Sequence, residues 1–242
     1  MTAPTIVSLV PSLTELVWWF GLGERLLGRT RFCIEPAGEI ERVPIIGGTK
    51  NPHVDRIVAL RPGVVIANKE ENRREDVEAL REAGLDVLLT DPNTVAEAVE
   101  MIMHLGARLG AGARAAGLAT EIEAELRAPV TAQPRVFVAV WKDPFMGLGA
   151  DSYGHDLIER AGATNVLRDR TRYPELSRDE LAALKPDLIL LPDEPYPFKP
   201  ADAEAFNGLA PCRIIDGRLL WWYGPRIPDA LRALRRAFED VG

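Results

Sequence analysis

Two segments of this chain, 124 residues apart, repeat one pattern of residue types. Residues 55–66 read DRIVALRPGVVI, and residues 179–190 read DELAALKPDLIL. Each pattern predicts a short helix that ends at a basic residue and a proline, followed by a strand buried on both faces. A weaker match at an offset of 141 relates residues 15–26 to residues 156–167. Because the two motifs have the same order in both halves, we predict two related lobes, the second with 17 fewer residues between its motifs.

Apolar β-branched runs alternate with segments of helical periodicity in both halves. The strands that we expect are Thr5–Val10, Gly63–Ala67, Asp86–Thr90, Arg135–Val140, Asp187–Leu191 and Cys212–Ile215. The helices that we expect cover residues 13–20, 53–60, 72–83, 94–109, 113–127, 154–161, 177–184 and 226–240. This alternation predicts an α/β fold of two pseudo-symmetric, Rossmann-like lobes with mostly parallel sheets.

Residues 94–133 are expected to form a helical connector between an N-terminal lobe, residues 1–93, and a C-terminal lobe, residues 134–242. The connector is rich in Ala, Leu and Glu, and Gly110-Ala111-Gly112 interrupts it. Its second helix, residues 113–127, would be about 22 Å long at 1.5 Å per residue. A helical connector favours a stiff pair of lobes with a cleft between them over the free motion of a Gly/Ser hinge.

Charge and hydropathy exclude two classes of partner. The 242 residues include 29 Lys and Arg against 36 Asp and Glu, a formal charge of −7, with no basic block to bind nucleic acid. The most apolar run, residues 16–23, is far shorter than the roughly 20 residues that span a bilayer, so we expect no membrane insertion. The start, Met1-Thr2-Ala3-Pro4, lacks a basic region and a cleavage site, so we expect no export if Met1 is the true start.

The sequence carries no motif of a known catalytic or metal site. Cys33 and Cys212 lie 179 positions apart, which fits neither a disulfide framework nor a zinc knuckle. The three histidines are scattered, and no H-E-x-x-H, G-x-S-x-G or nucleotide-binding loop is present. We predict a protein that is not an enzyme and that holds no cofactor and no metal through its own side chains.

Several segments, in order, resemble the helical-backbone substrate-binding proteins of ABC importers, the receptors for cobalamin, haem and ferric siderophores. They are Pro11-Ser12-Leu13-Thr14-Glu15, Phe32-Cys33-Ile34-Glu35-Pro36, Gly47-Gly48-Thr49-Lys50-Asn51-Pro52, the first copy of the repeat, the helical connector and Trp222-Tyr223-Gly224-Pro225-Arg226. The resemblance covers nearly the whole chain. It implies two α/β lobes bridged by one long helix, a ligand held in a shallow cleft between them, little domain closure, and a periplasmic or cell-surface location.

In the N-terminal lobe, four residues are candidate ligand contacts. Ser12 and Glu15 fit a capping box, and the N-terminus of their helix is alternatively a site for an acidic ligand group. Phe32 lies where the family has its first aromatic cleft residue, so it stacks on a ligand or belongs to the core. Lys50 would add a positive charge to the ligand cleft. Asn68 follows a buried strand, at the end where α/β sheets place ligand loops.

The C-terminal lobe holds most of the aromatic candidates. Trp141, Tyr153, Trp222 and Tyr223 lie in or beside loops, where large rings suit an apolar, flat-walled site. Arg226 would pair with a ligand carboxylate or amide. For a bound haem, the candidate axial ligands are Tyr153, Tyr223 and His155.

The family resemblance also implies one surface glutamate on each lobe that docks onto arginines of the membrane permease. The offset of 124 places Glu70 opposite Glu194, so we take Glu70 or Glu71, together with Glu194, as the docking candidates, with Glu75 as a further one. The alternative is a solvated charged face without a partner.

These observations favour a monomeric binding protein that hands a metal-chelate ligand to an ABC permease. Aromatic richness without a basic cleft favours cobalamin or a related corrinoid, with haem or a ferric siderophore as alternatives. A second hypothesis is a cytoplasmic corrinoid or metal-chelate chaperone, or an enzyme, on the same scaffold.

Overall fold

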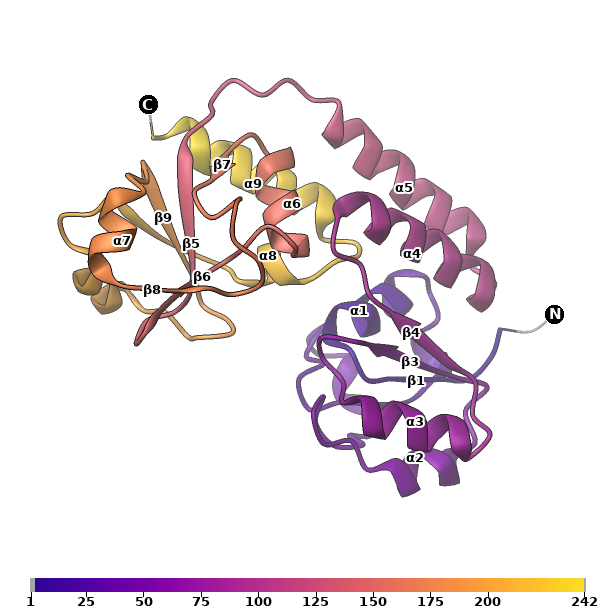
Figure 1. Cartoon of the computed structure of the whole chain (residues 1–242). Coiled ribbons are helices and arrows are strands. Elements are labelled where there is room, and N and C mark those ends of the chain that lie inside the picture. Colours follow the sequence, from indigo (N-terminus) through magenta and orange to yellow (C-terminus); the bar gives the residue numbers. More distant parts are fainter. Residues whose placement is uncertain (1–2, 242) are drawn as a thin grey trace. The chain divides into compact units, whose positions relative to one another are not determined.

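Parallel strands form the centre of each half of the chain, as the apolar runs predict. The computed structural model describes residues 3–241 (Figure 1). The chain divides into two compact units. Unit 1 contains the residues up to Pro92, together with Ala98–Ala119 and Trp222–Pro225. Unit 2 contains Asn93–Glu97, Thr120–Trp221 and the residues from Arg226 onward.

Unit 1 is built on a four-stranded parallel sheet in the order β2-β1-β3-β4. Its strands are β1 (Ile6–Ser8), β2 (Leu26–Arg29), β3 (Val64–Asn68) and β4 (Val87–Thr90). Every residue of β1 and β3 is buried, as expected where helices cover both faces of a parallel sheet. Figure 1 shows α2 (Val54–Leu60) and α3 (Arg74–Glu82) on one face and α1 (Pro11–Trp19) on the other. Two 3-10 turns, η1 (Gly23–Arg25) and η2 (Ile40–Arg42), lie in the connections.

Unit 2 has a mixed, six-stranded sheet in the order β10-β9-β5-β6-β8, with β7 paired to β5. The parallel strands are β5 (Arg135–Trp141), β7 (Thr164–Asn165), β9 (Leu188–Pro192) and β10 (Cys212–Ile215). The antiparallel strands are β6 (Phe145–Gly147) and β8 (Glu175–Leu176). The helices are α6 (Tyr153–Arg160), α7 (Arg178–Ala183), η3 (Pro200–Phe206), α8 (Arg218–Trp221) and α9 (Ile227–Glu239).

The internal repeat is visible in the backbone. Helices α2 and α7 are both followed by a basic residue in the left-handed region, Arg61 with φ 47° and Lys185 with φ 46°. Each precedes a proline, which disfavours the helical conformation in the residue before it. The two copies therefore end their helices by the same local geometry, and each then enters a buried strand.

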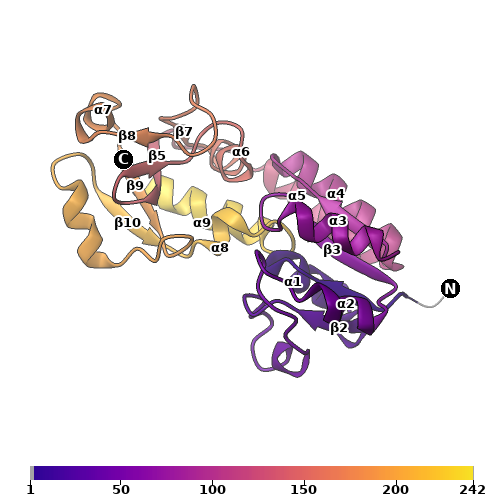
Figure 2. The same ribbon diagram turned by 60° about the horizontal axis from the view of Figure 1, so that its bottom comes forward.

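Helices α4 (Val95–Leu109) and α5 (Gly112–Leu126) pass from one unit to the other along the sequence, and they lie side by side in Figures 1 and 2. Gly110, with φ 76°, makes the turn between them. Their close approach depends on small residues, because a Cβ at Gly106 would lie 2.3 Å from the Cβ of Ala115.

The predicted fold class is confirmed, and the predicted helices and strands match the observed ones to within a few residues. The prediction missed strands β2, β6, β7 and β8 and helix α8. The boundaries at residues 93 and 134 stay a prediction. In the described part of the chain, no helix is both long and apolar enough to cross a membrane.

Candidate functional site

The loops that leave the carboxyl ends of β1 to β4 meet at one edge of the unit 1 sheet, because these strands are parallel. This is the edge where open α/β sheets bind ligands. Two buried asparagines tie its loops together. The side-chain amide of Asn68 donates to the backbone oxygen (3.1 Å) and hydroxyl (3.2 Å) of Thr90, and Asn68 Oδ1 accepts from the backbone of Glu70 at 2.8 Å.

Asn72 extends the same network to two further loops. Its Oδ1 accepts from the backbone of Asn68 at 2.8 Å, and its amide nitrogen donates to the backbone oxygens of Thr49 at 2.9 Å and Leu9 at 3.3 Å. Asn68, a predicted ligand contact, is thus occupied in holding the loop after β3. A contact between Asn68 and a ligand stays a prediction.

Residues 30–36 are held against α1 by a buried polar cluster. Thr14 Oγ1 lies 2.8 Å from the backbone oxygen of Val10 and 3.0 Å from Cys33 Sγ, which also contacts the hydroxyl of Thr30. Burial raises the pKa of the Cys33 thiol, although the two threonine hydroxyls act in the opposite direction, so this thiol is neutral. Its surroundings make it a structural cysteine.

Arg29, the last residue of β2, is buried. Its guanidinium donates to the backbone oxygens of Ile40, Val43, Thr30 and Cys33 at 3.0 to 3.3 Å. One guanidinium thus joins carbonyl groups from two separate loop segments, and it holds Thr30 and Cys33 on either side of Phe32.

The predicted capping box at Ser12 and Glu15 is wrong. Helix α1 begins at Pro11, its N-cap is Val10, and no side chain caps it. Proline fits the first turn of a helix, where its missing N–H needs no partner, and this moves the start one residue ahead of Ser12. Ser12 is 1% exposed, and its hydroxyl oxygen has no hydrogen-bond partner. Its predicted role in ligand binding stays open.

Phe32 and Lys50 lie on adjoining loops of this edge. The Phe32 ring is 54% exposed, and its Cε2 would lie 3.5 Å from a Cβ placed on Gly48. Lys50 Nζ donates to the backbone oxygen of Glu70. The unit 1 edge therefore presents an exposed ring supported by a glycine loop, with a cation beside it.

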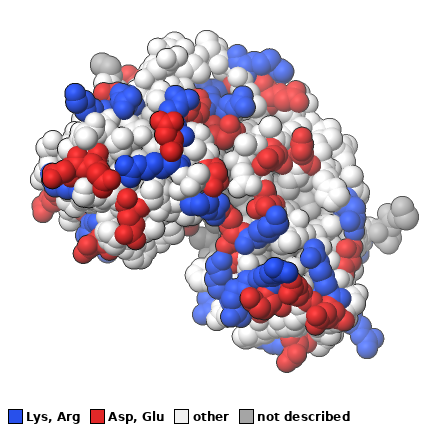
Figure 3. All heavy atoms as spheres, in the orientation of Figure 1, with Lys and Arg blue, Asp and Glu red and all other residues white. Residues whose placement is uncertain are grey.

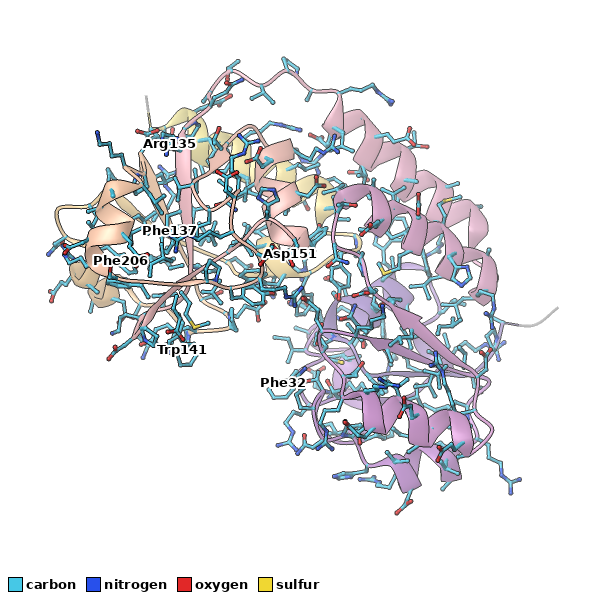
Figure 4. All side chains as sticks on the ribbon, viewed as in Figure 1. Phe32, Arg135, Phe137, Trp141, Asp151 and Phe206 are labelled. Carbon is cyan, nitrogen blue, oxygen red and sulfur yellow. The ribbon has the colours of Figure 1, made fainter. Side chains whose placement is uncertain are left out.

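The corresponding edge of unit 2 presents Trp141, the last residue of β5, with 42% of its surface exposed. Its ring centroid lies 4.9 Å from that of Tyr196, in a T-shaped arrangement. Lys142 pairs with Asp202 at 2.5 Å, and this hydrogen bond raises the pKa of Lys142. Figure 4 shows Trp141 farther along β5 than Phe137, and Phe32 on the loops of unit 1.

The chain matches the family described as "Periplasmic binding protein" over residues 6–208. The chain belongs to this family. The vitamin B12-binding protein of Salmonella typhimurium is 27% identical over 195 residues, which cover 78% of this chain and 72% of that protein. An uncharacterized ABC transporter substrate-binding lipoprotein of Bacillus subtilis, YvrC, is 26% identical over 200 residues. These cover 78% of this chain but only 63% of YvrC, less than two thirds of its length.

Solved structures of similar fold include two members with named ligands. The apo form of the periplasmic heme-binding protein RhuT from Roseiflexus sp. RS-1 has a TM-score of 0.82 at 24% identity, covering 99% of both chains. The periplasmic vitamin B12-binding protein BtuF of Vibrio cholerae has a TM-score of 0.82 at 19% identity, covering 100% of this chain and 99% of that one. These likenesses concern the fold. By family, the chain is therefore a periplasmic binding protein.

The remaining predicted ligand residues of this periplasmic binding protein are more enclosed. Tyr153, the first residue of α6, is buried, and burial raises the pKa of its hydroxyl. Trp222 and Tyr223 are also buried, and Arg226, at the N-cap of α9, is half-buried. His155 lies in α6 with its Nδ1 3.0 Å from Asn165 Nδ2, and burial lowers its pKa.

The predicted docking glutamates differ in exposure. Glu70 and Glu75 are exposed and Glu71 is half-buried. Glu194 is half-buried, its Oε1 atom is enclosed, and its backbone oxygen accepts from the indole of Trp221 at 2.6 Å. Their part in docking stays a prediction.

In the described residues, no three His, Cys, Asp or Glu side chains converge on a point suited to a metal ion. The absence of a metal site stays a prediction. The prediction of individual site residues omitted Tyr196. The signal for it was present: Pro195-Tyr196-Pro197-Phe198 places two rings directly after a buried strand, at the edge where ligand loops lie.

Proposed function

We propose that this protein binds cobalamin or a related corrinoid and delivers it to the permease of an ABC importer. The observation that carries the proposal is a pair of exposed rings, Phe32 in unit 1 and Trp141 in unit 2, each at the carboxyl-terminal edge of its sheet. Large exposed rings on rigid loops suit a flat macrocyclic ligand. The vitamin B12-binding proteins among its relatives support the same ligand class. The predicted cleft between the lobes stays a prediction.

The charges at the two edges support a ligand of low net charge. Lys69 is paired with Asp91 at 2.6 Å after β3 and β4, and Lys142 with Asp202 after β5. After β10, Arg218 pairs with Asp216 at 2.8 Å. On the face shown in Figure 3, cationic and anionic side chains are interspersed. Lys69, Lys142 and Arg218 are thus neutralised, whereas Lys50 donates to a backbone oxygen. Neutralised cations are poorly suited to a ferric tricatecholate, whose several negative charges would require several Lys or Arg side chains without carboxylate partners.

The environment of the candidate axial ligands favours a corrinoid over haem. The hydroxyls of Tyr153 and Tyr223 belong to buried residues, and a raised pKa keeps Tyr153 from forming a phenolate. His155 Nδ1 contacts Asn165. Cobalamin carries its own axial groups, so it needs rings and hydrogen bonds from a protein rather than a metal ligand.

The test is titration of the purified protein with cyanocobalamin, haem and a ferric tricatecholate, followed by visible spectra and tryptophan fluorescence. We expect a saturable response to cyanocobalamin. Phe32→Ala and Trp141→Ala should each weaken binding by about 5- to 30-fold, from the loss of a ring contact. Trp19→Phe, which changes another exposed tryptophan, should not. If neither cyanocobalamin nor haem gives a response, the proposal is refuted. If haem alone gives a response, the ligand is haem rather than a corrinoid.

Delivery to a permease requires a docking surface, for which Glu70 and Glu194 are the candidates. The double variant Glu70→Ala with Glu194→Gln should lose binding to permease reconstituted in proteoliposomes, while it still binds the ligand. Glu204→Ala, which removes an exposed carboxylate from η3, is the control. Docking of the double variant at wild-type affinity would show that other residues form this surface.

A further inference from the structure

The ring of Trp141 packs against that of Tyr196, which lies on a separate loop. The two ring centroids are 4.9 Å apart, and the ring planes make an angle of 76°. This edge-to-face arrangement is a favoured geometry for aromatic pairs. Trp141 is the end residue of a strand and is 42% exposed, so an edge-to-face contact of this kind can select its side-chain rotamer.

Tyr196 is in turn supported from the core. Its ring lies 4.6 Å from that of Phe198, which is buried, and Phe198 lies 6.4 Å from the fully buried Phe206. Phe206 also packs against Phe137 at the centre of β5. A continuous series of rings, Phe206, Phe198, Tyr196 and Trp141, thus connects the interior of unit 2 with its exposed indole. Figure 4 labels Phe137, Phe206 and Trp141.

An ion pair holds Tyr196 from another side. Lys142 Nζ lies 5.8 Å from the centroid of the Tyr196 ring and 2.5 Å from Asp202 Oδ1. The other oxygen of Asp202 accepts from the backbone of Lys199 at 2.8 Å. The hydrogen bond with Asp202 raises the pKa of Lys142, so this cation stays protonated at neutral pH.

We infer that Tyr196 is a positioning residue for ligand binding: its ring fixes the Trp141 indole in the orientation that meets the flat face of a ligand. The inference rests on the proposed function, because it assigns Trp141 to the ligand site. An indole held in one rotamer before binding loses less conformational freedom when the ligand arrives. The ring of Tyr196, rather than its hydroxyl, supplies this contact.

The experiment compares Tyr196→Leu with Tyr196→Phe in protein labelled with 5-fluorotryptophan. Trp141→Phe assigns the Trp141 fluorine resonance, and the affinity for cyanocobalamin is measured for each variant. We expect Tyr196→Leu to shift or broaden the Trp141 resonance and to weaken binding by about 3- to 10-fold. Tyr196→Phe should keep both properties near those of the wild type.

Tyr173→Leu is the matched control, since Tyr173 is a half-buried tyrosine of the same unit with the Arg172 guanidinium over its ring at 5.4 Å. It should change neither property. In the Trp141→Ala background, Tyr196→Leu should add no further loss, because the indole that it positions is gone.

Two results would overturn the inference. Unchanged affinity in Tyr196→Leu, with the wild type binding cyanocobalamin, would refute positioning and leave the proposed function intact. A wild type that does not bind cyanocobalamin would refute the proposed function and this inference with it. If Tyr196→Leu does not fold, Tyr196→Phe tests the inference. A loss of cyanocobalamin affinity in Tyr196→Phe would show that the hydroxyl is needed, which contradicts a role for the ring alone.

Discussion

Replacing Ser12 by alanine tests whether the first turn of α1 is capped by its side chain. A serine that caps a helix stabilises it by about 1 kcal/mol, so a capping box would make Ser12→Ala destabilising. In the structure the hydroxyl of Ser12 is buried and has no hydrogen-bond partner. Enclosing such a group costs about 1 to 3 kcal/mol, and removing it deletes only one heavy atom from the interior. We therefore expect Ser12→Ala to raise the free energy of unfolding by up to about 1 kcal/mol.

Thr14→Val is the matched comparison, two residues further along the same helix. The Thr14 hydroxyl contacts the hydroxyl of Ser8, the backbone oxygen of Val10 and the sulfur of Cys33. Valine keeps the shape of threonine and deletes these contacts, so the free energy of unfolding should fall by about 1 to 2 kcal/mol. Urea unfolding followed by circular dichroism measures both variants, and the denaturant slope shows whether the unfolded state has changed.

If Ser12→Ala lowers the free energy of unfolding by about 1 kcal/mol at an unchanged denaturant slope, this reasoning is refuted and Ser12 caps the helix. The same variant also tests ligand binding. If a ligand supplies the acceptor that the hydroxyl lacks, Ser12→Ala should weaken cyanocobalamin binding by about 5- to 10-fold while the free protein becomes more stable. Loss of affinity together with a gain in stability is the pattern expected of a polar group kept for binding.

Two further predictions concern packing and pH. In a urea titration, Gly106→Ala should lower the free energy of unfolding by about 1 to 2 kcal/mol, because its Cβ would meet Ala115. Gly117→Ala, with open space around it, should raise the free energy of unfolding by about 0.5 to 1 kcal/mol. Equal changes in the two variants would contradict the close packing at Gly106. Burial alone would raise the pKa of Glu125, but hydrogen bonds from Arg235 and Arg232 lower it below its ordinary value of 4.5. The stabilisation that ionised Glu125 gives to the folded state is therefore present above pH 4.5 and is lost as the pH falls through the folded-state pKa. In urea titrations, Glu125→Gln should lower the free energy of unfolding by about 1 kcal/mol at pH 7 and by progressively less toward pH 3. A difference between variant and wild type that stays constant with pH would exclude the ion pair as its cause.

Local patterns in the sequence were sufficient for the fold class. The helix ends at Arg61 and Lys185 depend only on neighbouring residues, since a proline disfavours the helical conformation in the residue before it. Strands β6 and β8 were missed because they have three and two residues, too few for any period, and exist through pairing between segments about 30 positions apart. Ser12 was misassigned because the helix begins at Pro11, two residues before the predicted start at residue 13.

The difference between local sequence patterns and contacts between distant segments also applies to the candidate site residues. Phe32 and Trp141 were candidates from the sequence, but the same reasoning also selected Tyr153, Trp222 and Tyr223, which are buried. The sequence places Tyr196 directly after a buried strand, whereas its contact with Trp141 joins residues 55 positions apart. A side chain that positions another is defined by contacts that only the fold creates. The sequence therefore proposes rings for the ligand site, and the structure is needed to distinguish exposed rings from buried ones and to find the ring that contacts Trp141.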